Sequence, residues 1–304
     1  MTVSPYTDSS VLVTGASTGI GRATALRLAE QGFQVFAGVR HAADAPAAPT
    51  DTITPVVLDI TDADSIAEAQ QTISAACGAR GLYGLVNNAG IGVSGPVEHV
   101  RLHDVRRQFE VNVFAQLAVT QDFLPLLRQG AGRVLMVSSV GSWITMPFAG
   151  PLCASKHALR SFTDALRMEV RPWDLEVILI EPGSIRTAAV DKLEADVEPT
   201  VESLGPLGAS RYGATYRDMA RAAIAHEQAG AGPEVVADVV LEALTADRPR
   251  TRYLAGPNAR RLSWAGRLLP NPALDAVRLR VLRPRSSRAT VPSPDLPSMA
   301  ATGR

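Results

Sequence analysis

Short runs of apolar residues alternate with longer segments of helical spacing over the first 182 residues of the chain. The apolar runs are nearly continuous, which is typical of strands buried on both faces of a parallel sheet. Strands are expected at residues 11–14, 34–38, 54–58, 83–87, 133–138 and 176–181. Helices are expected at residues 19–31, 63–77, 102–129 and 150–171. This alternation predicts an α/β domain, a single doubly wound parallel sheet with helices on both faces.

The pattern changes after residue 183. Residues 184–232 are rich in Ala, Gly and polar residues, and we expect an irregular segment there. A helix is then expected at residues 233–246 and a last strand at 251–254, which makes about seven strands. Pro, Ser, Arg and Thr dominate residues 284–304, which predicts a disordered tail after a domain spanning residues 1–283. The Arg-rich stretch at 260–288 contains interleaved Leu and Trp, and indicates either a terminal helix packed on the domain or a contact with acidic lipid.

Composition and charge exclude several classes of protein. The 304 residues are 46% hydrophobic and 20% charged, as expected for a soluble globular protein. Thirty basic and 30 acidic residues cancel, so the chain has no general attraction to nucleic acid. Cys77 and Cys153 are too few for a disulfide framework and lack the spacing of metal ligands. No apolar run approaches the roughly 20 residues of a membrane span, and residues 1–10 do not resemble a signal peptide. We therefore expect a cytoplasmic protein with a small-molecule ligand and no metal.

A glycine-rich turn, TGASTGIG at residues 14–21, directly follows the first strand and opens the first helix. Glycines permit a tight turn and let a pyrophosphate approach the helix N-terminus, where free N–H groups and the helix dipole favour negative charge. A turn of this kind can also be a simple strand-to-helix connection. Its place after the first strand favours a dinucleotide site, whose predicted contacts are Gly15, Ser17, Thr18, Gly19, Ile20 and Gly21.

The end of the second strand indicates which dinucleotide is bound. In sites that prefer NAD, an acidic residue there binds the ribose 2′-hydroxyl, whereas an Arg accommodates a 2′-phosphate. Val39 occupies the acid's position and Arg40 follows it, which favours NADP(H). The alternative is that Arg40 is an ordinary solvated surface residue.

Polar residues follow the third and fourth strands, at the edge of the sheet where ligands bind in open α/β folds. Asp59 and Ile60 follow the third strand, and the NNAG stretch, with Asn88, Ala89 and Gly90, follows the fourth. An Asp at this place can also simply cap the next turn. We expect these residues to line the cofactor site.

Taken in order, these motifs resemble those of the short-chain dehydrogenase/reductase family over about residues 10–254. The motifs are TGASTGIG, NNAG, Asn112, Ser138-Ser139, Lys156 and Pro182-Gly183. The stretches PFAGPLCASKHALRSFTDALRMEVRP and LIEPGSIRT are most similar to its retinol- and hydroxysteroid-dehydrogenase-like branch. The resemblance implies a Rossmann-type sheet with strand order 3-2-1-4-5-6-7, reduction of ketones or oxidation of alcohols with NAD(P), and a homodimer or homotetramer.

The resemblance also implies roles for individual residues. The family's catalytic tetrad of Asn, Ser, Tyr and Lys would fall on Asn112, Ser139, residue 152 and Lys156. Asp59 would contact the adenine and residues 88–90 the ribose side. Residues 184–232 would close over the substrate, and their Ala, Leu, Met and Tyr content suggests a lipophilic one. The nicotinamide end would be held by Pro182, Gly183, Ile185 and Thr187.

The sequence departs from the family at one decisive position, because Leu152 stands where the tetrad has Tyr. Residues i and i+4 share a helix face, so Leu152 and Lys156 still project together. Leucine has no hydroxyl, and loss of a general acid typically costs about 10²–10⁴-fold in rate. Only two of the 30 basic residues are Lys, and one of them is Lys156. Candidate substitute donors are Tyr212, Tyr216 and His226, although a residue of each kind in such a segment is more often an ordinary core or surface residue.

Three hypotheses remain open from the sequence. The first is an NADP(H)-dependent oxidoreductase in which Ser139 polarises the substrate oxygen while Lys156 and Asn112 fix cofactor and water. The second is a redox-inert NADP-binding protein that serves as a partner subunit or sensor. The third is a lyase, cyclase or isomerase that uses the same pocket.

Overall fold

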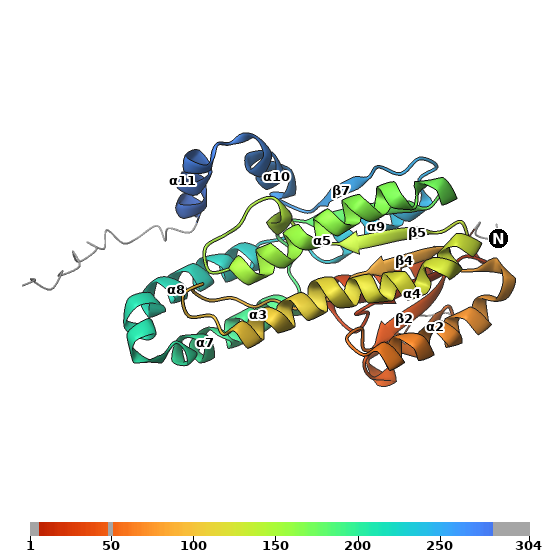
Figure 1. Cartoon of the computed structure of the whole chain (residues 1–304), viewed down its shortest axis with the longest axis horizontal. Helices are drawn as coiled ribbons and strands as arrows, with labels where there is room; N and C mark the ends of the chain where they lie inside the picture. Colours follow the sequence, from red (N-terminus) through yellow and green to blue (C-terminus); the bar gives the residue numbers. More distant parts are fainter. Residues whose placement is uncertain (1–5, 48–50, 282–304) are drawn as a thin grey trace, which may run out of the picture.

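The computed structural model describes residues 6–47 and 51–281 and contains a seven-stranded sheet (Figure 1). Every neighbouring pair of strands is parallel, in the order β3-β2-β1-β4-β5-β6-β7, which confirms the predicted fold class. The predicted tail at residues 284–304 lies outside the described residues. The strands are β1 (Ser10–Thr14), β2 (Gln34–Val39), β3 (Ile53–Val57), β4 (Gly84–Asn87), β5 (Arg133–Val137), β6 (Glu176–Pro182) and β7 (Arg252–Ala255).

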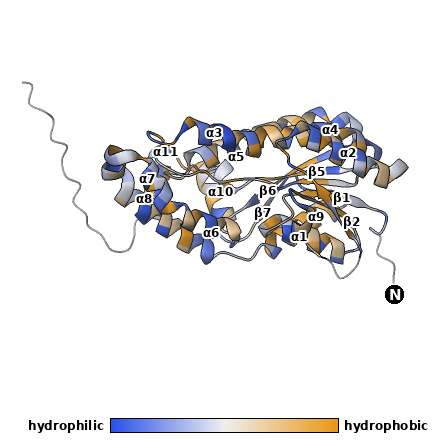
Figure 2. Ribbon diagram, turned by 90° about the horizontal axis from the view of Figure 1, so that it is seen from below, coloured by the Kyte–Doolittle hydropathy of each residue, from blue (hydrophilic) through white to orange (hydrophobic). Residues whose placement is uncertain are grey.

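Helices cover both faces of the sheet, and each face buries its own hydrophobic layer (Figure 2). Successive side chains of a strand point to opposite faces. In β6, Val177 and Leu179 therefore pack beneath α2, α4 and α5, whereas Ile178 and Ile180 pack beneath α1 and α9. This burial on both faces is why the strands have continuous apolar sequences. These helices are α1 (Gly19–Glu30), α2 (Ala63–Cys77), α4 (Ala115–Gln129), α5 (Gly150–Glu169) and α9 (Glu234–Thr245).

Residues 102–129, predicted as one helix, contain a π-helical turn. The segment consists of α3 (Leu102–Phe109), the turn η3 (Glu110–Phe114) and then α4. The turn carries Asn112, which is only 1% exposed. Such turns occur frequently at functional sites. The apolar pattern does not reveal the turn because it leaves the helical spacing on either side intact.

The expectation of an irregular segment at residues 184–232 is wrong, since most of this segment is helical. On α8, the buried residues Tyr216, Ala220 and Ile224 follow one another at intervals of four and form one helix face. Small residues such as Gly208 and Gly213 are also buried, so the contrast between apolar and polar positions is weak. The helices are α6 (Ala188–Ala195), α7 (Val197–Ser203) and α8 (Gly205–Gln228), and they pack on one another (Figure 1).

Two further helices follow β7, namely α10 (Ala259–Leu268) and α11 (Asn271–Val281). Helix α10 packs closely on the segment after β5, because a Cβ atom at Gly266 would lie 2.5 Å from the carbonyl oxygen of Trp143. The side chain of Leu274 in α11 is also buried. None of the helices in the described residues is long and apolar enough to cross a membrane.

Candidate functional site

The glycine-rich turn after β1 packs against the segment that follows β4. Gly15 has a φ of 64°, and a Cβ atom there would lie 2.9 Å from Cα of Ala89. Asn88 donates from Nδ2 to the carbonyl oxygens of Thr14 at 2.9 Å and Gly15 at 3.3 Å. The Thr14 hydroxyl in turn accepts hydrogen bonds from the N–H groups of Asn88 and Ala89. Two predicted cofactor-binding segments therefore form one surface at the carboxyl ends of β1 and β4.

The N-terminus of α1 is open to a ligand. Thr18 occupies the N-cap position, but its side chain makes no capping hydrogen bond, so the first N–H groups of the helix remain available to an anion. Gly19 has a φ of 54°, and a Cβ atom there would lie 3.3 Å from Cβ of Thr187. The predicted nicotinamide-end residue Thr187 is thus brought against the glycine turn. Ser17 and Ile20 are half-buried in the same turn, and Gly21 is buried.

Arg40 and Asp59 follow the carboxyl ends of the paired strands β2 and β3. The guanidinium of Arg40, which is exposed, helps to lower the pKa of Asp59, although the larger cause is hydrogen bonding from Thr61. Asp59 Oδ1 accepts from the Thr61 hydroxyl at 2.7 Å and from its N–H at 2.9 Å. Ile60, between them, is buried. Asp59 thus caps the following turn, and its second carboxylate oxygen stays available to a ligand.

The side-chain amide of Asn112 forms two hydrogen bonds with the backbone of Ile91. Its Oδ1 accepts from the N–H of Ile91 at 2.9 Å, and its Nδ2 donates to the carbonyl oxygen of Ile91 at 3.0 Å. A Cβ atom at Gly90 would lie 3.3 Å from Asn112 Oδ1, so a larger residue at this position would crowd the amide. The π-helical turn is therefore fastened to the NNAG segment.

Ser139 and Lys156 both lie at the carboxyl end of β5. Lys156 reaches from α5 and donates from Nζ to the carbonyl oxygen of Val137 at 2.9 Å. Ser139 follows two residues later, and its Oγ accepts from the N–H of Gly141 at 3.0 Å. Burial lowers the pKa of Lys156 from 10.5 to about 8. The two predicted catalytic residues are therefore brought together at the carboxyl edge of the sheet.

Leu152 lies in the first turn of α5, where it is half-buried. Its carbonyl oxygen accepts a hydrogen bond from Ser155 Oγ at 2.7 Å, and Ser155 Oγ also accepts from Asn112 Nδ2 at 3.3 Å. Ser155 was not predicted as a site residue, yet it is fully buried and connects α5 to the π-helical turn. The backbone at residue 152 is thus connected through Ser155 to Asn112.

The candidate substitute donors are engaged elsewhere. Tyr216 is buried, and its hydroxyl lies 2.7 Å from Ser94 Oγ. Tyr212 donates to the carboxylate of Glu98. His226 is exposed and its Nε2 lies 3.2 Å from Asn258 Nδ2. Within the described part of the chain, none of the three has a hydrogen bond to Ser139, Leu152 or Lys156.

Comparison with known proteins agrees with this geometry. The family model of short chain dehydrogenases matches residues 9–198, more than half of the chain. The chain belongs to the short-chain dehydrogenase family. The matched region contains the glycine turn, Asn112, Ser139, Lys156 and the Pro182-Gly183 pair, so the family resemblance read from the sequence is confirmed.

Relatives of this chain share about a third of its residues over nearly its whole length. NADPH-dependent 3-dehydrocapnine reductase of Ornithobacterium rhinotracheale is 35% identical, with 88% of this chain and 94% of that protein covered. Mouse retinol dehydrogenase 5 is 34% identical, with 93% and 92% covered. The similarity to retinol dehydrogenases agrees with the branch indicated by the sequence.

Solved structures show the same fold. A short-chain dehydrogenase from Burkholderia cenocepacia in complex with NADP has a TM-score of 0.69 at 24% identity, over 92% of this chain and all of that one. Another from Streptomyces avermitilis has a TM-score of 0.68 at 26% identity, with coverages of 90% and 94%. The Rossmann-type architecture is therefore shared across the whole domain.

A residue beside the predicted site that the sequence did not reveal is Glu227, at the end of α8. Its Oε2 accepts from the N–H of Ile185 at 3.0 Å, and burial raises its pKa. Ile185 also forms an isolated parallel β-bridge with Ala231. The predicted nicotinamide-end segment is thereby tied to helix α8. Pro182 closes β6, and the N–H of Gly183 donates to the carbonyl oxygen of Ala255 at 2.8 Å.

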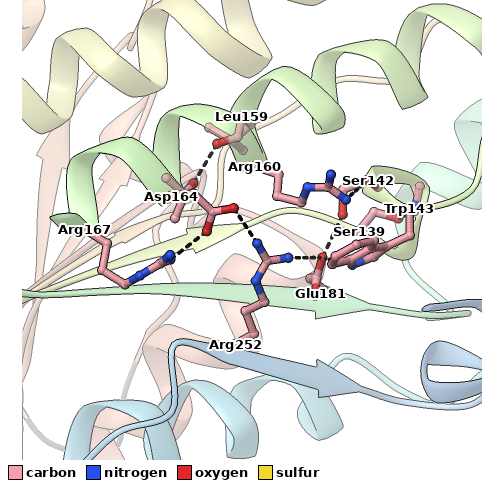
Figure 3. Close-up of polar contacts among 11 residues, drawn as sticks. Ser139, Ser142, Trp143, Leu159, Arg160, Asp164, Arg167, Glu181 and Arg252 are labelled. Carbon is pink, nitrogen blue, oxygen red and sulfur yellow. Dashed lines mark hydrogen bonds and ion pairs between the residues drawn. The ribbon is translucent and has the colours of Figure 1, made fainter. Parts of the chain in front are cut away.

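Glu181 is the second residue that sequence reasoning missed. It is 1% exposed, sits one residue before the Pro182-Gly183 pair and accepts hydrogen bonds from Ser142 and Trp143 (Figure 3). A single acid inside the apolar run LIEP was the available signal, since a buried carboxylate requires partners.

Proposed function

We propose that this chain is an NADP(H)-dependent oxidoreductase that acts on a carbonyl or alcohol group. The observation that carries the proposal is that Lys156 and Ser139 both lie at the carboxyl end of β5, in the same parallel sheet in which the open, glycine-lined N-terminus of α1 follows the carboxyl end of β1. The positive φ angles of Gly15 and Gly19 form a tight turn that leads into the uncapped N-terminus of α1, which suits the pyrophosphate of a dinucleotide. We call this turn and helix N-terminus the cofactor cradle. When bound, the nicotinamide supplies the hydride that this chemistry needs.

The preference for NADP(H) rests on Arg40 and on Val39, which leaves no acid at the end of β2. Arg40 is exposed and directly follows β2, the strand end at which an Arg accommodates the ribose 2′-phosphate in NADP sites. Two findings on other proteins support this choice. One relative is named as NADPH-dependent, and one structural neighbour contains NADP. The remaining contacts are those of residues 15–21, 59–60, 88–90 and 182–187.

In the proposed reduction, Ser139 donates a hydrogen bond to the substrate oxygen and polarises the carbonyl group. Its Oγ already accepts from Gly141, which leaves the hydroxyl proton for the substrate. Asn112 and Ser155 hold α5 against the π-helical turn, so that Lys156 keeps its place. These residues orient the reacting groups without large movement of the chain.

The proton for the product alcohol requires a donor other than Leu152. Lys156 projects from the same face of α5, and burial brings its pKa to about 8, near the range in which an acid works at neutral pH. We assign the proton to the Lys156 ammonium, which would exchange its hydrogen bond to Val137 for one to the substrate oxygen. Rates below those of a tyrosine-bearing relative are expected.

The missing hydroxyl is also the observation that favours a second candidate, a redox-inert NADP-binding protein. In that case the same cradle binds the cofactor and no hydride leaves it. A non-redox lyase, cyclase or isomerase would use the pocket in a third way. All three share the cofactor cradle, so only the fate of the hydride separates the first from the others.

The test follows NADPH oxidation with a panel of ketones, for the wild type and for Leu152→Tyr. Oxidation by the wild type supports the oxidoreductase. NADPH binding with no oxidation by either protein, both shown to be folded, would overturn it in favour of the redox-inert or non-redox candidates.

We further propose a lipophilic substrate and a cytoplasmic homodimer or homotetramer. Phe148 lies 5.6 Å from Tyr216 between ring centroids, so aromatic surface gathers where α8 meets the loop after β5. Large apolar side chains on and beside α4 and α5 are exposed, which suits burial against a second subunit. Both cysteines are free, as is usual in a reducing compartment. The exposed residues are Phe114, Phe162, Met168 and Trp173.

A further inference from the structure

The carboxylate of Glu181 binds the turn that follows Ser139 (Figure 3). Its Oε1 accepts from the hydroxyl of Ser142 at 2.7 Å and from the indole Nε1 of Trp143 at 2.5 Å. Ser142 and Trp143 belong to the same tight turn, because their N–H groups donate to the carbonyl oxygens of Ser139 and Val140. One buried oxygen thus holds two side chains of the segment that presents Ser139.

Glu181 is buried, and burying a carboxylate is costly unless it is paired and hydrogen-bonded. Its partner in charge is Arg252 on the neighbouring strand β7, with Nη1 4.0 Å from Glu181 Oε1. Nη2 of Arg252 contacts Asp164 of α5 at 2.5 Å. The carboxylate is therefore fixed by strands β6 and β7, and the chain of charges continues into helix α5.

Helix α5 also contacts this turn, through Arg160. Arg160 donates from Nη1 to the carbonyl oxygen of Ser142 at 2.6 Å, and its guanidinium lies 3.9 Å from the ring centre of Trp143. Arg160 follows Lys156 by four residues and therefore shares its helix face. Arg267 of α10 also lies 3.9 Å from the Trp143 ring. The turn is thus connected to the helix that carries Lys156.

We propose that Glu181 is a positioning residue of the candidate active site: its hydrogen bonds to Ser142 and Trp143 hold the Ser139 turn in register with Lys156. The inference deepens the proposed oxidoreductase function and rests on it. Glu181 does not touch the reacting atoms. Without its carboxylate, the buried hydroxyl and indole N–H lose their acceptor, and Ser139 moves relative to the substrate oxygen.

Four variants separate positioning from simple stability. Glu181→Leu removes the acceptor and keeps a similar volume, whereas Glu181→Gln keeps one oxygen that can accept both hydrogen bonds. Ser142→Ala combined with Trp143→Phe removes both donors and leaves Glu181 in place, which covers the case in which Glu181→Leu fails to fold. Glu242→Gln is the matched control, because Glu242 is an exposed acid on α9 that pairs with Arg250 and, in the part of the chain that the structure describes, has no contact with the Ser139 turn.

Two readouts are needed, one of them independent of activity. The first is kcat and KM for NADPH-dependent ketone reduction. The second is amide hydrogen exchange of residues 139–144, measured by mass spectrometry. For Glu181→Leu and for the double variant we expect kcat to fall by at least about tenfold with KM changed less, because small displacements of a catalytic group are costly. We expect exchange of this segment to accelerate by a similar factor.

Glu181→Gln and Glu242→Gln should stay within about threefold of the wild type in both readouts, since neither loses the two acceptor bonds. Unchanged exchange of residues 139–144 in folded Glu181→Leu or in the double variant overturns the proposal. Faster exchange with unchanged kcat overturns it as well. A wild type that binds NADPH and reduces no ketone refutes the proposed function instead, and the exchange measurement then still decides whether Glu181 orders the turn.

Discussion

The ammonium group of Lys156 donates a hydrogen bond to the carbonyl oxygen of Val137, two residues before Ser139. A helix and a strand end, 19 residues apart in sequence, are joined by this contact. The same position on α5 one turn earlier carries Leu152, which has no hydrogen-bonding side chain. The Lys156 ammonium is therefore the titratable group of the tetrad positions, and its proton is accessible to experiment.

Lys156 is expected to make the stability of the protein depend on pH between about 8 and 10.5. The folded-state pKa is lowered, so the stabilising effect of the neutral amine is present above the unfolded pKa and is lost as pH falls through about 8. As pH falls from about 10.5 to about 8, the free energy of unfolding of the wild type relative to Lys156→Met should decrease by on the order of 3 kcal/mol. Below about pH 8 this difference should level off. Denaturant titrations at several pH values measure it. A difference that is constant with pH would contradict the burial of the ammonium.

Arg40 is expected to determine the preference for the phosphorylated cofactor. NADPH should bind at least about tenfold more tightly than NADH, a difference of about 1.4 kcal/mol. Arg40→Ala should remove most of that difference, because the contact with the 2′-phosphate is lost. Calorimetry with both cofactors measures it. Arg80→Ala is the control, since Arg80 is an exposed Arg that precedes β4, at the amino ends of the strands. Equal affinities of the wild type for the two cofactors would refute the assignment.

Glu227 is expected to hold the end of α8 against residues 184–186. Glu227→Ala leaves the N–H of Ile185 without its acceptor, at a cost of about 1–3 kcal/mol. Amide exchange of Ile185, Arg186 and Ala231 should accelerate, whereas exchange in β1 and β4 should not change. Glu227→Gln retains an acceptor oxygen and serves as the matched variant. Equal exchange in the alanine variant and the wild type would show that other contacts close this segment.

The strands and the family motifs were predictable because each has a local signal. A strand such as β6 buries both faces, so its apolar run identifies it, and the glycine turn is recognised by its position after β1. The helices at residues 188–228 were missed because small buried residues such as Gly208 and Gly213 give no apolar contrast. Glu181 and Glu227 contact partners about 40 residues away in the sequence, and a local sequence pattern cannot predict such contacts.

Restoring the hydroxyl at residue 152 is expected to raise the rate of hydride transfer. In Leu152→Tyr, the phenol would share a helix face with Lys156, whose ammonium favours ionisation of the phenol, and Ser139 and Asn112 already hold their places. Regaining one general acid should increase kcat/KM for simple ketones by about 10² or more. Single-turnover oxidation of bound NADPH measures it directly.

Leu152→Phe is the matched control for this experiment, because it adds the ring without the hydroxyl. If the gain depends on proton donation, Leu152→Phe should stay at the wild-type rate while Leu152→Tyr rises. In wild type, activity that depends on the Lys156 ammonium should fall as pH rises through about 8, because a deprotonated amine has no proton to give. With tyrosine restored, the rate should no longer require that proton from Lys156, and the decline should move to a different pH. A rise of equal size in the phenylalanine variant would mean that shape at residue 152, rather than proton transfer, limits the reaction.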